Sequence, residues 1–306
     1  MIPPSRESRE YLRELRQRPA FGAVGNDFDL DALREGMGTP KVPADSSVKC
    51  IGAQIDGLPC VWVLAPGADP DLRLLYLHGG GYVSGSPANY LPLAADLSAA
   101  AQCAVLLPDY RLAPEYPFPA AIEDCICAHE WMITHGPYGA APSSATFIAG
   151  DSAGGCLTLA TLLALRDRQQ PLPLAAMPLS ACTDLTLASE SMQTEEDPIC
   201  SARCMPTFVE LYLGDADPRN PLASPVFADY TGIPPLLLQV GEHEMLRDDS
   251  VRLAAKAEAD GVDVKLEIWP GMVHVFQIRE LPESREAIDH LADFMQSCLP
   301  AERKHA

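Results

Sequence analysis

Residues 147–155 of this chain read Phe147-Ile-Ala-Gly-Asp-Ser-Ala-Gly-Gly155. An apolar strand runs into a turn of the form Gly-x-Ser-x-Gly and then into an apolar helix, which is the setting that this motif requires. The glycines permit a cramped turn that lifts the Ser152 hydroxyl clear of the backbone, and the helix N-terminus behind it favours developing negative charge. A bare Gly-x-Ser-x-Gly occurs by chance in roughly one chain in ten of this length, so it also fits a glycine-rich helix entry with a capping serine.

On both sides of this stretch, short apolar runs alternate with longer amphipathic runs, which is the pattern of strands and helices wound around a mostly parallel sheet. We therefore predict an α/β fold. The expected strands are residues 48–55, 60–65, 74–77, 104–108, 146–149, 175–179, 236–240 and 264–269. The expected helices are residues 88–101, 119–134, 153–166, 248–260 and 283–298. Asp56-Gly57 joins the first two strands as a hairpin signal, so the leading edge of the sheet should be antiparallel.

Two segments do not follow this alternation. Residues 1–45 precede the first strand, and residues 184–222 interrupt the pattern with a short helical stretch from Thr207 to Leu213. No internal repeat and no flexible Gly/Ser linker occurs, so we expect no independent second domain. The two segments should instead cover a catalytic body formed by residues 46–183 and 223–306.

The composition is that of a globular protein with a sizeable core, since 47% of the 306 residues are hydrophobic and 21% are charged. The net charge of -20 repels phosphate backbones and anionic membrane surfaces, so we expect neither nucleic acid nor a membrane as a partner. The first residues lack the apolar core of a signal peptide, and no apolar run reaches the length of about 18 residues that a membrane span needs. A cytoplasmic location follows as an expectation.

The ten cysteines include no Cys-x-x-Cys pair, and most lie inside apolar runs such as those around Cys103 and Cys182. We interpret them as small, buried, reduced side chains. The nearest approach to a metal-binding spacing is Cys200-x-x-x-Cys204, and no histidine lies close by to complete a tetrahedral site. We therefore expect no bound metal.

A second glycine motif follows another apolar strand, in Leu75-Tyr-Leu-His-Gly-Gly-Gly-Tyr82. His-Gly-Gly-Gly arises by chance in only about a few chains per thousand. Consecutive glycines let backbone N–H groups point at one spot, as an oxyanion hole requires, and the N–H of Ala153 would be a further donor. The alternative is a flexible loop. His78, so near the glycines, is expected to orient the loop by hydrogen bonding and not to act as the catalytic base.

The base is expected at His274, in a loop after the last predicted strand, because the order along an α/β-hydrolase chain is serine, acid, histidine. The acid should follow the strand that ends near Gly241, where Glu244 and Asp248 are both candidates. The remaining histidines fit surface or packing positions better; they are His129, His135, His243, His290 and His305.

Taken together, these motifs resemble those of the hormone-sensitive-lipase-like esterases, also called bacterial family IV, across essentially the whole chain. The matching stretches are His78-Gly-Gly-Gly81, Asp109-Tyr-Arg-Leu-Ala-Pro-Glu115, Gly150-Asp-Ser-Ala-Gly-Gly155, Gly241-x-x-x-x-Leu-Arg-Asp248 and Gly271-Met-x-His-x-Phe276. The resemblance implies an eight-stranded sheet, a helical cap built from the N-terminal helices and an insertion, and hydrolysis of short acyl esters without a cofactor. It places the oxyanion donors at Gly80, Gly81 and Ala153.

Two positions in these motifs need comment. Where many members carry Asp as the triad acid, this chain has Glu244, which is chemically adequate because the acid only holds the imidazole tautomer and stabilises the imidazolium. The charges of Asp109, Arg111 and Glu115 carry no assignable chemistry and are expected to pin the turn after a strand.

The predicted reaction is acyl transfer, in which Ser152 attacks an ester carbonyl while His274 takes its proton. The alternatives are an amidase or deacetylase that uses the same residues, and a non-hydrolytic ligand-binding relative. The sequence does not fix the oligomeric state and leaves a homodimer open. The residues expected to bound the substrate pocket are Tyr82, Phe208, Leu211, Tyr212 and Phe276.

Overall fold

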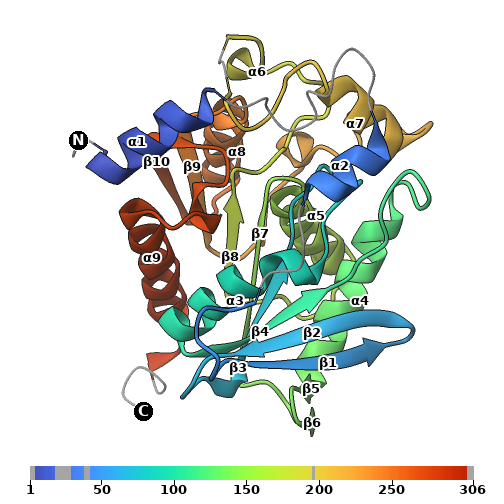
Figure 1. The fold of residues 1–306 in the computed structure, drawn as a ribbon. Coiled ribbons are helices and arrows are strands. Elements are labelled where there is room, and N and C mark those ends of the chain that lie inside the picture. The colour runs from blue at the N-terminus through green and yellow to red at the C-terminus, as the bar shows by residue number, and fades with distance from the viewer. Residues whose placement is uncertain (1–3, 18–28, 38–41, 195–196, 302–306) are drawn as a thin grey trace.

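An eight-stranded sheet runs through the computed structural model, which describes residues 4–17, 29–37, 42–194 and 197–301 (Figure 1). Its strands, in spatial order, are β1 (Lys49–Ile55), β2 (Leu58–Leu64), β4 (Cys103–Pro108), β3 (Asp69–Leu77), β7 (Ala145–Asp151), β8 (Ala176–Leu179), β9 (Leu236–His243) and β10 (Val264–Val273). β2 pairs antiparallel with both β1 and β4, and the other neighbours pair in parallel. The predicted fold class and the antiparallel hairpin at Asp56-Gly57 are therefore confirmed.

Both faces of the central strands are buried, and their side chains alternate between two apolar layers. Along β3, Leu74 and Tyr76 belong to one layer, whereas Leu75 and Leu77 belong to the other. The first layer contains helices α3 (Pro87–Ala101) and α9 (Pro282–Cys298), and the second contains α4 (Ala120–Thr134), α5 (Ala153–Asp167) and α8 (Arg247–Ala259). Helices covering both faces explain why these strands appear in the sequence as continuous apolar runs.

The predicted elements all occur, and they differ from the observed ones mainly at their ends. β3 begins at Asp69 instead of residue 74, because Asp69 still pairs with Cys103 beyond an irregularity in the register. The polar sequence at this end of the strand gives no strand signal. β10 continues to Val273 through a second register shift at Gly271, where φ is +70°. A short pair, β5 (His135–Gly136) with β6 (Gly139–Ala140), was not expected from the sequence.

Four helices belong to the two segments that break the strand and helix alternation, namely α1 (Arg6–Leu15), α2 (Leu30–Gly36), α6 (Glu190–Thr194) and α7 (Met205–Leu213). α2, α6 and α7 lie beyond the carboxyl ends of the strands, and α1 lies beside β10 and α9 (Figure 1). The segments also include residues 1–3, 18–28, 38–41 and 195–196, which are outside the described part of the chain.

Specific polar contacts attach the N-terminal helices to the body. The Ser5 hydroxyl of the α1 cap donates to Glu283 at the start of α9, with 3.0 Å between the oxygens. The Arg34 guanidinium of α2 binds both carboxylate oxygens of Glu115 at 2.7 and 2.8 Å and also donates to the carbonyl of Val83. Glu115 therefore connects the turn after β4 to α2.

The Asp109 to Glu115 turn is also held from within the body. The Arg111 guanidinium pairs with Asp124 of α4 at 2.8 Å, and the backbone N–H of Arg111 donates to the same carboxylate at 2.8 Å. The structure thus gives Arg111 and Glu115 the turn-pinning contacts that the sequence predicts.

All ten cysteines are free thiols, and five of them are buried; Cys50 on β1 is exposed, contrary to the expectation of general burial. Across the described ranges, no helix is both long enough and apolar enough to cross a membrane. The described residues also contain no cluster of three or more His, Cys, Asp or Glu side chains able to hold a metal ion.

Candidate active site

Ser152 occupies a strained turn between β7 and α5. Its φ of 53° and ψ of -118° lie in a region that non-glycine residues rarely adopt, and its N–H donates to the carbonyl of Leu179 at 2.8 Å. A Cβ atom at Gly150 would collide with the Gly154 carbonyl, and one at Gly154 would collide with the carbonyl of Leu77. The two glycines of Gly-x-Ser-x-Gly are therefore required because α5 starts directly against β3.

His274 and Glu244 complete a hydrogen-bonded chain with this serine. The His274 Nε2 atom lies 3.0 Å from Ser152 Oγ, and its Nδ1 atom lies 2.9 Å from Glu244 Oε2. His274 is 4% exposed and Glu244 is fully buried. With Nδ1–H donating to the carboxylate, Nε2 is the nitrogen that can accept the serine proton. Hydroxyl, imidazole and carboxylate in this order are the groups that activate serine for attack on a carbonyl carbon.

Asp248, the other candidate acid, lies in a different environment. Its Oδ2 accepts the backbone N–H of Ser191 at 2.9 Å, and its Oδ1 pairs with Arg247 at 3.1 Å. The contact with Ser191 attaches α6 to the start of α8. The structure therefore brings Glu244, and not Asp248, to the imidazole.

The environment shifts the pKa values of the two buried partners in the same direction. Burial raises the pKa of the Glu244 carboxyl, although contact with His274 opposes this shift. Burial lowers the pKa of His274, but the neighbouring Cys200 and Glu244 side chains outweigh that effect, so its pKa is raised well above the ordinary value of 6.5. A base with a raised pKa binds the serine proton more readily.

The glycine loop after β3 adopts backbone conformations that favour glycine. Gly80 and Gly81 have φ values of +126° and +65°, and a Cβ atom at Gly80 would overlap the backbone of Ser84. Neither N–H of this glycine pair donates to another described residue. The Ala153 N–H is likewise unpaired within its helix because it lies in the first turn of α5. All three residues border the same cavity as Ser152.

His78 orients this loop. Its Nδ1 donates to the Gly79 carbonyl at 2.8 Å, and its ring stacks on Tyr110 with 4.2 Å between centroids. The Tyr110 hydroxyl in turn donates to the His78 carbonyl at 2.6 Å. Burial lowers the pKa of His78 to about 4, so the ring is neutral at pH 7. The catalytic-base role for His78, set aside on the sequence, finds no support in these contacts.

Asp151 links the serine turn to the glycine loop, a role that the sequence motifs do not indicate. Its carboxylate accepts hydrogen bonds from the Tyr76 and Tyr90 hydroxyls, both at 2.9 Å, and from the Gly79 N–H at 3.1 Å. Burial raises the pKa of Asp151 to about 6, and the tyrosine hydroxyls oppose this rise. The sequence did contain one signal for this role, because Asp151 directly precedes the predicted nucleophile.

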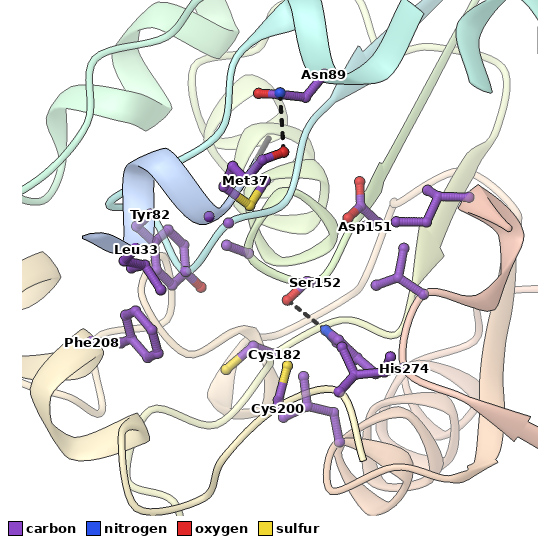
Figure 2. A pocket seen from close by; sticks show the side chains of 18 of the residues that line it. Leu33, Met37, Tyr82, Asn89, Asp151, Ser152, Cys182, Cys200, Phe208 and His274 are labelled. Atoms are coloured by element: carbon purple, nitrogen blue, oxygen red, sulfur yellow. Dashed lines mark hydrogen bonds between the residues drawn. The ribbon is translucent and has the colours of Figure 1, made fainter. Parts of the chain in front are cut away.

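A cavity of about 570 Å³ opens over Ser152. Figure 2 shows Ser152 and His274 facing into it, with the thiol of Cys200 near the imidazole and with Phe208 and Leu33 farther away. The segments that form it come from α1, α2, α3 and α7 as well as from the carboxyl ends of the strands. Residues distant in sequence therefore cover the serine.

Of the five residues expected to bound the pocket, Tyr82 and Phe208 line this cavity and the other three do not. Tyr212 points inward and stacks on Tyr82 with 3.7 Å between ring centroids, so it supports the wall from behind. Leu211 is partly buried against the core. Phe276 is fully buried against Trp269, because the chain turns into the 3₁₀ helix η2 (Phe276–Ile278) directly after the base.

Cys200 was considered on the sequence only for a metal site, and the structure places its thiol beside His274 instead. Asp197 accepts the backbone N–H groups of Ile199 and Cys200 at 2.8 and 3.0 Å, and its other oxygen accepts the Met245 N–H at 3.2 Å. The segment before α7 is thus held beside the loop that carries Glu244. No local sequence pattern signals this long-range contact.

Comparison with known proteins gives concordant matches over most of the chain. The profile of a family described as alpha/beta hydrolase fold matches residues 74–278. An acetyl-hydrolase of Streptomyces hygroscopicus is 39% identical, covering 97% of this chain and 98% of the relative. An esterase of Acinetobacter venetianus is 35% identical over 73% of this chain and 74% of the relative.

Solved structures are similar over nearly the full length. The crystal structure of an esterase from the bacterial hormone-sensitive lipase family superposes with a TM-score of 0.88 at 39% identity, covering 98% of this chain and all of the other. EstE5, whose crystal was soaked with p-nitrophenyl butyrate, gives a TM-score of 0.88 at 40% identity, covering 96% and 99% of the two chains.

Proposed function

This chain belongs to the hormone-sensitive lipase family of alpha/beta hydrolases, and on that basis we propose that it hydrolyses short acyl esters through Ser152, His274 and Glu244. Its relatives over most of its length are esterases, and the chain is a carboxylic ester hydrolase. The observation that carries the proposal is the continuous hydrogen-bonded chain from Ser152 Oγ through His274 to Glu244, at 3.0 and 2.9 Å.

In the first half of the reaction, Ser152 Oγ attacks the ester carbonyl carbon and His274 Nε2 takes the hydroxyl proton. The carbonyl oxygen becomes an oxyanion, which would accept hydrogen bonds from the N–H groups of the glycine loop and of Ala153. Glu244 stabilises the imidazolium that forms. The imidazolium then gives its proton to the departing alcohol oxygen as the carbon–oxygen bond breaks, which leaves an acyl-serine.

In the second half, water replaces the alcohol. His274 takes a proton from the water molecule, the resulting nucleophile attacks the acyl-serine, and a second oxyanion forms in the same place. Collapse of this intermediate returns the proton to Ser152 and releases the carboxylic acid. The protons balance over the cycle.

Short acyl chains are supported by the cover over the serine. The cavity of about 570 Å³ is bordered by Leu33 of α2 and Phe208 of α7, and we expect these side chains to limit its depth. Each methylene that enters such a cavity contributes about 0.8 kcal/mol until the chain meets the end wall, so we expect an optimum at about four to six carbons. The soak of the similar EstE5 with a butyrate ester and the name acetyl-hydrolase of another relative agree with this range.

We further propose that residues 1–45 and 184–222 form the cap and that residues 46–183 and 223–306 form the catalytic body. Support comes from contacts that cross between the parts, which include Arg34 to Glu115 and Asp197 to Met245. The Phe208 ring packs so close to Gly81 that a Cβ atom there would lie 3.0 Å from it. The cap would therefore form the outer wall of the acyl site.

Amide hydrolysis is the second candidate, because the name acetyl-hydrolase does not specify whether the acetyl group leaves oxygen or nitrogen. The same residues can attack either carbonyl. Measuring kcat/KM on a p-nitrophenyl ester and the matching p-nitroanilide separates the two, and we expect a strong preference for the ester.

The decisive experiment for the nucleophile combines a variant with a covalent probe. Ser152→Ala should lower kcat by roughly a millionfold while the fold survives, because alanine fits the turn. The intact protein should gain the mass of one organophosphate adduct, mapped to Ser152, and the variant should gain none. Substantial ester hydrolysis by the variant, or an adduct on a different serine, would overturn the assignment.

A further inference from the structure

Arg279 introduces a positive charge into the wall of the cavity that contains the serine. It directly follows η2 and borders the cavity together with Ile278 and with Tyr11 of α1. Phe208 borders the same cavity from α7, and α1 and α7 lie on opposite sides of the space above the sheet (Figure 1). The cavity therefore has an apolar side near Phe208 and a cationic side near Arg279.

Only one other fixed charge competes with it. Among the described residues that border the cavity, the charged groups besides the base His274 are Asp151 and Arg279. The Asp151 carboxylate is already occupied by two tyrosine hydroxyls and a backbone N–H. Its oxygens therefore have partners other than the guanidinium.

The Arg279 guanidinium also lacks a carboxylate partner within the described ranges, unlike several other arginines of this chain. In a protein with 42 acidic and 22 basic residues, Arg34, Arg111 and Arg252 each pair with a carboxylate at 2.6 to 2.8 Å. Within the described ranges Arg279 has no such pair, and its Nε is buried without a hydrogen-bond acceptor. Its guanidinium carbon lies over the Tyr11 ring, 5.9 Å from the ring centroid.

A guanidinium that has no carboxylate partner within the described ranges can pair with an anionic ligand. A guanidinium is charged at every relevant pH and binds a carboxylate or phosphate through two parallel hydrogen bonds. The Tyr11 ring limits its motion by a cation–π contact, which leaves the planar group positioned for a ligand. The missing partner on the cationic side is thus an anion.

We propose that Arg279 selects esters that carry an anionic group, a carboxylate or a phosphate, on the part of the substrate that lies between α1 and η2. This inference rests on the proposed function, because the same Ser152 attack cleaves the ester. The net charge of -20 does not prevent it, since charges separated by more than about 8 Å are largely screened at physiological ionic strength. Inside the cavity the nearby guanidinium has the larger effect.

The test compares matched neutral and anionic esters. Mono-p-nitrophenyl adipate and its methyl ester place the charge on the acyl side, and 4-acetoxybenzoate and its methyl ester place it on the alcohol side. For each pair, the ratio of kcat/KM for the anionic member to that for the neutral member is measured at constant ionic strength. Taking this ratio removes general effects of a substitution on catalysis.

Three variants test whether Arg279 determines this ratio. Arg279→Gln removes the charge, Arg279→Lys keeps it without the planar fork, and Arg285→Gln removes an equal charge from an exposed position on α9 that does not border the cavity. We expect Arg279→Gln to lower the ratio by about tenfold or more for at least one pair, mainly through KM. Arg279→Lys should restore part of it, and Arg285→Gln should keep the wild-type ratio.

A ratio that is the same in wild type and Arg279→Gln for both pairs, or one that Arg285→Gln lowers as much, would overturn the inference. In either case hydrolysis of the neutral esters by the wild type leaves the proposed function standing. If the wild type hydrolyses no ester and takes up no organophosphate, the proposed function and this inference both fail.

Discussion

The Asp151 carboxylate accepts a hydrogen bond from the Gly79 backbone N–H at 3.1 Å, so the residue that precedes the serine also holds the loop of the expected oxyanion donors. The hydroxyls of Tyr76 and Tyr90 reach the two oxygens of the same carboxylate. One buried side chain thereby fixes the separation between the nucleophile and the N–H groups of Gly80 and Gly81. Catalysis of acyl transfer depends on that separation because the donors must meet the oxyanion as it forms.

Replacing this carboxylate should therefore impair catalysis without removing a reacting group. In Asp151→Asn, the amide nitrogen can only donate, so at least one of the three groups that donate to this carboxylate loses its acceptor. We expect kcat to fall by about tenfold or more, with a smaller change in KM. Tyr90→Phe, which removes one donor and keeps the carboxylate, should have a smaller effect. Equal kcat values for wild type and Asp151→Asn in a p-nitrophenyl acetate assay would contradict the positioning role.

The acid is tested by two substitutions that remove charge from neighbouring carboxylates. Glu244→Gln should lower kcat by about a thousandfold or more, because an amide favours the wrong imidazole tautomer. Asp248→Asn should lower it by less than about tenfold, since an amide oxygen can still accept the Ser191 N–H. Thermal unfolding of both variants separates a loss of catalysis from a loss of structure. A larger loss in the Asp248 variant would exchange the two roles.

The pH profile should show the raised pKa of His274. The protonated imidazole cannot accept the Ser152 proton, so kcat/KM should decrease as the pH falls through this pKa, with a midpoint above the ordinary value of 6.5. Removing the Glu244 carboxylate removes a stabilising partner of the imidazolium, so the midpoint should move to lower pH in the residual activity of Glu244→Gln. A midpoint at or below 6.5, or no movement in the variant, would contradict the assigned cause.

The sheet and its flanking helices could be predicted from the sequence because each depends on a local signal, and the relation between Ser152 and His274 could be predicted because the order serine, acid, histidine is typical of an α/β-hydrolase chain. Strands covered on both faces appear as apolar runs, and a Gly-x-Ser-x-Gly sequence between an apolar strand and an apolar helix indicates a nucleophile turn. The start of β3 at Asp69 was missed because a polar strand end has no such signal.

The walls of the cavity could not be predicted in the same way, because they depend on which distant segments meet above the sheet. Helical spacing in residues 207–213 indicates an amphipathic helix but does not say which side chain faces the serine, and Tyr212 turned out to support Tyr82 instead. The contacts that bring Cys200 to His274 run through Asp197 and Met245, which are far apart in the chain. Long-range contacts of this kind leave no periodic pattern.

Cys200 should make the enzyme sensitive to small thiol reagents. Its thiol borders the cavity beside His274, so a methylthio group added by methyl methanethiosulfonate would occupy space next to the base. Burial raises the pKa of Cys200, and because the thiolate is the reactive form, inactivation should be faster at pH 9 than at pH 7.

The matched control for the thiol experiment is Cys50, which is exposed on β1. Cys50→Ser should be inactivated like the wild type, whereas Cys200→Ala should retain most of its own untreated activity after the same exposure. Peptide mass spectrometry identifies the modified residue. Full inactivation of Cys200→Ala would show that a different thiol is responsible.

Phe208 should set the length of acyl chain that the enzyme accepts. Its ring borders the cavity and lies so close to Gly81 that a Cβ atom on Gly81 would be 3.0 Å from it. The apolar side of the cavity would therefore end near the expected oxyanion donors. Removing the ring opens space for additional methylenes, each worth about 0.8 kcal/mol when buried. In Phe208→Ala, the maximum of kcat/KM across p-nitrophenyl esters from acetate to palmitate should move to chains longer by about two carbons or more.

Phe208→Leu, which leaves a smaller hole and costs less stability, should move this maximum less. Leu211→Ala is the control, because Leu211 lies on the same helix outside the cavity. An unchanged profile in Phe208→Ala, or an equal shift in Leu211→Ala, would show that Phe208 does not form the end wall.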